Sequence, residues 1–139
     1  MTATLTETDR VRVLADKFIE FLETNRLPEG LLARDFFADV TVPTWRLQAD
    51  SAQRLLAIRL GGHPIRGEVI RRRVEPTLNG FIIEFEERWR DGGQDWYSRE
   101  MIRADVSEEG ITDLSVYCTG DWDEARVAEH RAAVTLLRP

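Results

Sequence analysis

The sequence contains little cysteine and no long apolar run. Its single cysteine, Cys118, cannot form an internal disulfide, so we expect a reducing, cytoplasmic setting. No stretch approaches the roughly 18 apolar residues of a membrane-spanning helix, and no membrane partner is expected. The two histidines, His63 and His130, lie far from each other and from the cysteine. This spacing matches no metal-binding pattern, so the sequence predicts no metal site.

The chain also lacks an excess of positive charge. The chain has 19 Lys and Arg residues against 25 Asp and Glu residues, and its net charge is −6. Nucleic-acid binding requires a basic surface that neutralises phosphates, so no nucleic-acid partner is expected. The basic cluster at residues 71–73 falls in an expected strand, where side chains alternate between faces. The glycine pairs at residues 61–62 and 92–93 indicate turns, no phosphate loop or dinucleotide fingerprint is present, and no cofactor is expected.

The sequence contains enough apolar residues to form a hydrophobic core. The chain has 139 residues, of which 42% are hydrophobic, and this fits one domain over residues 1–139. Apolar residues at helical spacing, after an acidic first turn, predict a helix from Thr6 to about Asn25. Pro28 is typical of the first residue of a helix, and it predicts a second, short helix through Phe37.

The remainder of the chain predicts one more helix, then strands, then a closing helix. Residues 39–48 should be extended, with Pro43 at an edge or bend. Asp50, with Gln53 three residues later, resembles a capping box that opens the third helix. Four strands should follow between about residues 68 and 120. A last helix, capped by Asp121, should extend to about Leu137.

Two hairpin turns set the expected pairing of the strands. The dipeptide at residues 79–80, Asn-Gly, is typical of a two-residue hairpin turn. Counting outward from that turn places Arg72 opposite Glu87. The next turn, at residues 91–94, places Glu87 opposite Ser98.

These pairings predict a polar row on an otherwise apolar, inward face. Arg72, Glu87 and Ser98 form the row, and Glu100 lies one step along. A carboxylate in an apolar pocket can act as a general acid or base, two close carboxyls can share a proton, and an arginine can bind a developing oxyanion. We therefore expect Glu87, Arg72, Glu100 and the rim residue His63 as catalytic candidates. Candidate ligand contacts on this side are Phe18, Trp45, Phe85, Trp89, Trp96, Ser98, Val116 and Cys118.

Each candidate also has a non-catalytic interpretation. Arg72 and Glu87 can form a structural ion pair that needs no substrate. His63 can be a partner of the helix C-terminus or a solvent-exposed residue. Cys118 can be a small buried apolar residue, and the tryptophans can belong to the core. The sequence leaves these alternatives open.

The opposite, outward face of the expected sheet is polar with alternating charge. Such a face suits a wet, symmetric interface between two copies, so we expect a homodimer. The residues expected on this face are Arg73, Glu86, Arg88, Arg99, Arg103 and Tyr117.

Three stretches, together with the order of the elements, carry a resemblance to a known superfamily. They are FIEFLETN, FFADVTVPTW and EEGITDLSVYCTGDWD, at residues 18–25, 36–45 and 108–123. The chain resembles the nuclear transport factor 2-like (NTF2-like) superfamily and, within it, the SnoaL-like group. The resemblance implies an α+β cone, in which three N-terminal helices wrap a curved antiparallel sheet and a C-terminal helix follows.

The resemblance also implies a pocket between the helices and the concave face of the sheet, and frequent dimerisation. It implies a protein that binds a small hydrophobic or aromatic molecule and, if the site is catalytic, transforms it in the manner of a SnoaL-like cyclase, isomerase or hydratase. A non-catalytic ligand-binding or dimerisation module on the same fold is the alternative. A ketosteroid isomerase-like site does not carry over, because Pro43 and Thr44 stand where its aspartate base would be. Of an epoxide hydrolase-like site, only the carboxylate of Glu87 is kept.

Overall fold

The computed structural model describes residues 6–139. Its helices are α1 (Glu7–Thr24), α2 (Ala52–Gly62) and α3 (Glu124–Ala133). Its strands are β1 (Leu32–Val42), β2 (Trp45–Ala49), β3 (Glu68–Pro76), β4 (Gly80–Asp91), β5 (Gln94–Ser107) and β6 (Gly110–Cys118). No helix among residues 6–139 is long and apolar enough to cross a membrane.

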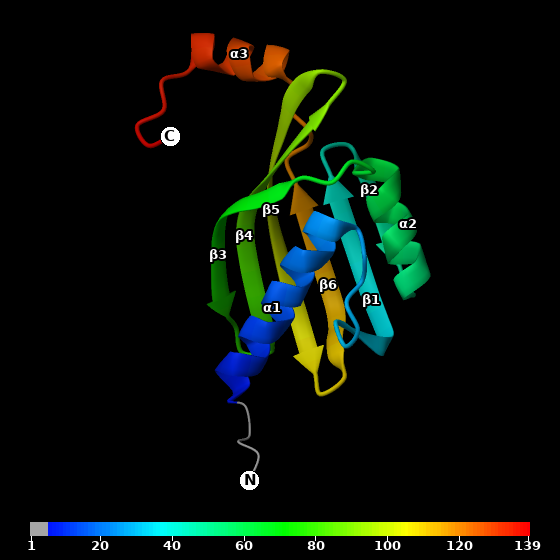
Figure 1. Cartoon of the computed structure of the whole chain (residues 1–139). Helices are drawn as coiled ribbons and strands as arrows, with labels where there is room; N and C mark the ends of the chain where they lie inside the picture. Colours follow the sequence, from blue (N-terminus) through cyan, green and yellow to red (C-terminus); the bar gives the residue numbers. More distant parts are fainter. Residues whose placement is uncertain (1–5) are drawn as a thin grey trace.

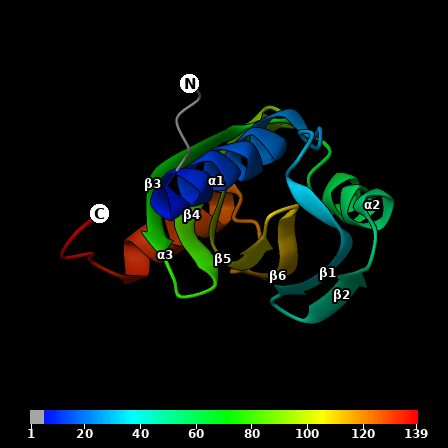
Figure 2. The same ribbon diagram turned by 90° about the horizontal axis from the view of Figure 1, so that it is seen from below.

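All six strands form one curved sheet in the order β2-β1-β6-β5-β4-β3. Neighbouring strands are antiparallel except for β1 and β6, which pair in parallel. Helix α1 crosses the concave face, while α2 lies beside the β1–β2 edge (Figures 1 and 2). Helix α3 projects from the end of the sheet where β4 turns into β5 (Figure 1). The predicted α+β class is confirmed.

Helix α1 has the predicted bounds, because its ends are encoded locally. The Thr6 hydroxyl accepts a hydrogen bond from the Asp9 backbone N–H (3.1 Å), which satisfies a donor that the first turn leaves free. Asn25 ends the helix in the left-handed region (φ 57°) and donates its backbone N–H to the Phe21 carbonyl (2.8 Å). Asparagine tolerates this conformation better than most residues do.

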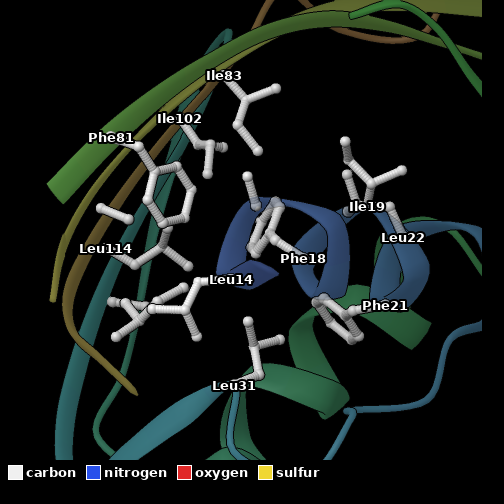
Figure 3. Close-up of a cluster of buried hydrophobic side chains, with 14 of the residues drawn as sticks. Leu14, Phe18, Ile19, Phe21, Leu22, Leu31, Phe81, Ile83, Ile102 and Leu114 are labelled. Atoms are coloured by element: carbon white, nitrogen blue, oxygen red, sulfur yellow. The ribbon is translucent and has the colours of Figure 1, made fainter. Parts of the chain in front are cut away.

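The core lies between α1 and the concave face of the sheet (Figure 3). Removing large apolar side chains from water is the main driving force for this packing. The labelled members of the cluster come from α1, from the connection that follows it and from the central strands: Leu14, Phe18, Ile19, Phe21, Leu22, Leu31, Phe81, Ile83, Ile102 and Leu114.

The predicted second helix is wrong, so two helices rather than three precede β3. The chain turns at residues 28–31, where Gly30 has φ 80°, and then enters β1. The apolar residues of this stretch fit either a helix or a strand at short range. Pairing of β1 with both β2 and β6 satisfies its backbone on two sides, and this tertiary pairing decides for the strand. Pro43 lies in the turn between β1 and β2.

The other two helices exist, but their caps differ from the predictions. Ser51, not Asp50, caps α2, and its hydroxyl accepts from the Arg54 backbone N–H (3.2 Å). Asp123, not Asp121, caps α3 and accepts from the Arg126 backbone N–H (2.8 Å). Short polar side chains adjoin both helix starts, so composition alone does not select the capping residue.

The predicted turn of the β3–β4 hairpin is wrong by two residues. Pro76 pairs with Phe81, and the Thr77 N–H donates to the Gly80 carbonyl (2.9 Å). Gly80 has no positive φ. Its role is close approach, because a Cβ there would lie 1.9 Å from the Ala104 carbonyl oxygen of β5. The Asn-Gly signal therefore marks a crowded strand start rather than a two-residue turn.

A bulge changes the pairing again further along β3. The register shifts between Ile70 and Arg73, and beyond the shift Val69 lies opposite Glu87. Arg71, inside the bulge, has a left-handed backbone (φ 51°). The extra residue reverses the alternation of faces, so Arg72 is not in the inward row. On the outward face, Arg73 lies opposite Glu84.

The β4–β5 hairpin follows the predicted register throughout. Glu87 pairs with Ser98, and Trp89 pairs with Trp96. On the outward face, Arg90 and Asp95 form a cross-strand ion pair, at 2.8 Å. The turn residues and the cross-strand charges favour the same register here, and the predicted pairing of β4 with β5 is confirmed.

Candidate functional site

A buried ion pair joins α2 to β4. The Arg59 guanidinium donates from Nη1 to Glu87 Oε2 (3.0 Å) and from Nη2 to Glu87 Oε1 (2.5 Å). Their side chains are 8% and 5% exposed, respectively. Two parallel hydrogen bonds of this kind fix orientation as well as charge. Arg59 therefore holds the Glu87 carboxylate in one position on the concave side of the sheet.

The remaining donors of Arg59 are used by the end of α1. Its Nε donates to Asn25 Oδ1 (3.1 Å), and its Nη2 also donates to the Leu22 carbonyl (2.7 Å). Asn25 in turn donates from Nδ2 to the His63 carbonyl (3.1 Å). The site is therefore built from the C-terminal ends of α1 and α2 together with β4.

Two further polar residues come from β5. Ser98 lies opposite Glu87, and Glu100 lies two residues further along the same strand. All three are buried, and the Ser98 hydroxyl donates to Glu100 Oε2 (3.4 Å). Side chains two apart on a strand share a face, which explains why these two point to the same side. The predicted neighbourhood of Glu87, Ser98 and Glu100 is confirmed.

The two carboxyl groups have opposite pKa shifts. Burial raises the pKa of Glu100, and the hydrogen bond and negative charge of Glu87 raise it further, to well above the ordinary value for glutamate. Burial also raises the pKa of Glu87, but the hydrogen bonds from Glu100 and Arg59 and the Arg59 charge outweigh it, so this pKa is lowered. When the pair holds a single proton, these opposite shifts place it on Glu100 and leave Glu87 as the ionised partner.

His63 lies beside this pair, at the C-terminal cap of α2. Its ring packs edge-to-face against Trp89, with centroids 4.7 Å apart, and its Nε2 is 3.5 Å from Asp121 Oδ1. Burial lowers the pKa of His63, and the Arg59 charge adds to this, although Glu87 and Asp121 oppose it. His63 is therefore a neutral imidazole at neutral pH. Its acidic partner, Asp121, lies in the segment between β6 and α3.

Cys118 completes this side of the site from β6, where it pairs with Glu100. Burial and the Glu100 charge raise the pKa of its thiol to about 12. A thiol with this pKa has almost no thiolate at neutral pH, and the thiolate is the nucleophilic form. The interpretation of Cys118 as a small, partly buried apolar residue is therefore favoured.

The other residues predicted to contact a ligand differ in their location and exposure. Phe18 and Phe85 belong to the core, with 2% exposed each. Trp89 and Trp96 stack with centroids 6.3 Å apart. Trp45 begins β2 and is 67% exposed, so it is not part of the buried cluster. Val116 packs against the core from β6. Their contact with a ligand stays a prediction.

Arg72 was predicted as the partner of Glu87, and this is wrong. The bulge in β3 turns it to the edge, where its Nη2 lies 3.4 Å from Glu23 Oε1 of α1 and its Nε donates to the Val69 carbonyl (2.9 Å). The sequence contained a signal for the true partner. Arg59 follows Leu55 by four residues, and both are buried on one face of α2, as helical periodicity requires.

The arrangement can perform proton transfer. Two buried carboxyl groups with opposite pKa shifts lie close together, so that Glu87 can accept a proton and Glu100 can donate one. Among residues 6–139, no group of three or more His, Cys, Asp or Glu side chains is placed to hold a metal ion. Neither the hollow beside α3 nor the one beside the β3–β4 turn is lined by Arg59, Glu87 or Glu100.

Comparisons with known proteins agree with this architecture at the level of fold. No family model matches the chain, and no curated protein is significantly similar to it. An NTF2-like protein from Anabaena variabilis shares 15% identity with it over 86% of this chain and 97% of that one, with a TM-score of 0.62. A candidate isomerase from Bacillus subtilis shares 12% identity over 95% and 99% of the two chains, with a TM-score of 0.65.

A third solved structure is a candidate SnoaL-like polyketide cyclase from Shewanella denitrificans. It shares 11% identity over 90% of this chain and 98% of that one, with a TM-score of 0.59. Each of these likenesses covers nearly the whole of both chains. The chain therefore has the NTF2-like fold that its sequence resembles, in the form also found in a SnoaL-like protein.

Proposed function

We propose that the chain binds a small hydrophobic or aromatic molecule on the concave side of the sheet and transfers a proton on it. The reaction class is that of a cofactor-independent isomerase, cyclase or hydratase. The observation that carries the proposal is the buried carboxyl pair, in which Arg59 bonds to Glu87 and the pKa of Glu87 is lowered while that of Glu100 is raised.

Each member of the pair has a distinct role in this proposal. Glu87 accepts a proton from an acidic C–H bond of the ligand, and Glu100 donates a hydrogen bond, and then its proton, to the oxygen on which negative charge develops. Arg59 is a positioning residue, because it acts through Glu87. The solved structures named as an isomerase and as a polyketide cyclase support chemistry of this class on this fold, although fold by itself does not imply function.

Access to the pair requires movement of a side chain. Glu87 and Glu100 are only 4% and 8% exposed. His63, Cys118 and Asp121 lie at the partly open side, where the Asp121 side chain is 38% exposed. We propose that a ligand enters between these residues and displaces the contact between His63 and Asp121, which is weak while His63 is neutral.

The second candidate function is a non-catalytic binding or dimerisation module. One observation favours it: all three nitrogens of the Arg59 guanidinium donate to groups inside the protein, namely Asn25, Leu22 and Glu87. A fully satisfied buried pair needs no substrate to stabilise it. In this case Glu87 only anchors α2 to the sheet through Arg59.

Exchange of carbon-bound hydrogen can separate the two functions, because it reports proton transfer whatever the final product is. A panel of small aromatic ketones in deuterium oxide would be followed by proton NMR, with loss of the α-proton signal as the readout. The proposal predicts catalysed exchange of at least one ketone and its loss in Glu87→Gln. It also predicts slower exchange in Glu100→Gln, which keeps a hydrogen-bond donor but has no proton to transfer.

The control for that experiment is Arg72→Gln, which removes an outer guanidinium that is not near the pair. This variant should exchange the same ketone at the wild-type rate. Folding of each variant would be checked by its thermal transition. Exchange that persists in folded Glu87→Gln would contradict the proposed base, and the absence of exchange throughout the panel would favour the non-catalytic module.

We also propose that residues 1–139 form one domain and that the chain is a homodimer. Two large exposed side chains, Met101 and Tyr117, are 41% and 57% exposed and pair across β5 and β6 on the outward face. Arg103 flanks them and contacts Asp105 at 2.9 Å. An apolar centre with a charged rim is typical of interfaces between two copies.

A further inference from the structure

Three arginines on the outward face converge on one buried carboxylate. Glu86 is 5% exposed, and its oxygens lie 3.9 Å from Arg71, 3.8 Å from Arg88 and 3.6 Å from Arg99. Each of these distances is longer than a hydrogen bond. Among residues 6–139, the guanidinium groups of these three arginines form no hydrogen bond. The cluster therefore has an excess of positive charge and several free donors.

The backbone is strained to build this cluster. Val69 faces inward opposite Glu87, so regular alternation would turn Arg71 inward two residues later. The bulge, with Arg71 at φ 51°, brings its side chain to the outward face beside Glu86 instead. A left-handed backbone at a residue other than glycine is costly, and such residues gather at functional sites. The strain is thus a second, independent indication that the cluster has a role.

The cluster is the floor of a groove beneath α3 and the C-terminal segment. Helix α3 is anchored by a bridge in which the Tyr97 N–H donates to the Trp122 carbonyl (3.0 Å) and the Trp122 N–H donates to the Tyr97 carbonyl (2.7 Å). The two rings pack edge-to-face, with centroids 5.7 Å apart. From this anchor α3 projects beyond the sheet, and the chain end turns back (Figure 1). Both aromatic rings line the groove.

The charge of the groove is opposite to that of the chain. Seven arginines and five acidic side chains line it, whereas the whole chain has a net charge of −6. Two of these arginines, Arg131 and Arg138, come from α3 and the C-terminal segment and so lie across the groove from the strands. A groove with arginines on both sides can surround a compact anion.

We propose that this arginine groove is a binding site for a small organic anion that carries a phosphate or carboxylate group. Planar guanidinium groups bind both anions through paired hydrogen bonds, and Tyr97 and Trp122 offer rings to the organic part. The site is separate from the carboxyl pair, because Glu86 and Glu87 face opposite sides of β4. The proposal does not depend on the proposed function.

Titration at low ionic strength with three probes tests the proposal: inorganic phosphate, phenyl phosphate and benzoate. Binding would be followed by calorimetry and by the fluorescence of Trp122 and the other tryptophans. We expect saturable binding of at least one probe, and the strongest probe identifies the anionic group. The double variant Arg88→Gln/Arg99→Gln should bind it at least about tenfold more weakly, because a charge-assisted hydrogen bond contributes about that much.

Two further variants are included: one should bind the probe more tightly than the wild type, and the other is a control that should bind it equally well. Glu86→Gln removes the central negative charge, so it should bind the same probe more tightly. Arg73→Gln removes an arginine that is 71% exposed, pairs with Glu75 at 2.8 Å and does not line the groove. It should bind as the wild type does. If Glu86→Gln does not fold, the comparison of the double variant with Arg73→Gln still shows whether the arginines of the groove bind the probe.

Several outcomes would overturn the proposal. One is the absence of saturable binding for all three probes. Another is equal weakening by Arg73→Gln and by the double variant, which would indicate a general effect of net charge. A third is a dimer in solution that dissociates in the double variant while no probe binds, because the groove would then be occupied by a second copy.

Discussion

Arg59 connects the charged groups of the concave side to the helices, and its removal is expected to be costly. Breaking a buried ion pair by removing one partner costs about 3–5 kcal/mol, because the other charge is left uncompensated. We therefore expect Arg59→Met to lower the free energy of unfolding by about this amount. Urea denaturation would measure it. The double variant Arg59→Met/Glu87→Met should lose less than the sum of the two single changes.

Arg72 supplies the matched control for that prediction. Its side chain is 45% exposed, and its partner Glu23 is 31% exposed, so Arg72→Met should cost only about 0–1 kcal/mol. A loss in Arg72→Met as large as that in Arg59→Met would mean that the register predicted from the turn, and not the observed one, describes the protein.

Glu100 gives the stability of the protein a particular dependence on pH. Its pKa in the folded state is raised well above the unfolded value of 4.5, so the folded state keeps a proton that the unfolded state releases. The stability that Glu100 contributes by keeping this proton is therefore fully present below its pKa in the unfolded state. It is lost as the pH rises through its pKa in the folded state. Glu100→Gln does not titrate, so its free energy of unfolding should rise relative to that of the wild type over this window.

Urea denaturation of both proteins from about pH 5 to about pH 8 would measure that difference. His63 titrates in part of the same range with the opposite sign, since its lowered pKa adds stability above the unfolded value of 6.5. Because both proteins contain His63, its contribution cancels to first order in the comparison. A Glu100→Gln variant that loses stability relative to the wild type as the pH rises would contradict the assignment of the shared proton to Glu100.

At the scale of elements, the start of α2 offers a comparison between a predicted and an observed cap. Ser51 accepts a hydrogen bond from the Arg54 backbone N–H, whereas Asp50 only forms an exposed pair with the Arg54 side chain at 3.1 Å. We expect Ser51→Ala to cost about 1 kcal/mol, the usual value for a lost cap. Asp50→Ala should cost a few tenths of that, in proportion to an exposed pair. Thermal denaturation would rank the two, and the reverse order would contradict the observed cap.

The strands show why local signals predict some elements and not others. At the β4–β5 turn, the turn residues, the alternation of apolar residues and the cross-strand charges all agree, and the register was predictable. At the β3–β4 turn, a shift by two residues keeps every side chain on the same face, so alternation could not detect the error. The bulge at Arg71 then shifted the remainder of β3. No short sequence pattern in β3 predicts this bulge, because the bulge is stabilised by contacts with other elements.

At the scale of the whole molecule, the outward face predicts association. We expect the chain to be a homodimer by light scattering at micromolar concentration, and we expect Tyr117→Glu to shift it toward the monomer. A charge at the apolar centre of an interface is left desolvated and unpaired. Leu78→Glu is the control, because Leu78 is 94% exposed in the β3–β4 turn, away from this face. A wild-type protein that is monomeric under these conditions would contradict the proposal.

The α+β class, the long first helix from Thr6 to about Asn25, the β4–β5 hairpin, and the neighbourhood of Glu87, Ser98 and Glu100 could all be predicted from the amino-acid sequence. These features depend on residues close in sequence, or on one well-marked turn. Two features became apparent only in the folded structure: residues 32–42 form a strand, and Arg59, not Arg72, holds Glu87. Both outcomes depend on contacts between elements far apart in the chain, where burial of charge and completion of the sheet outweigh local preference.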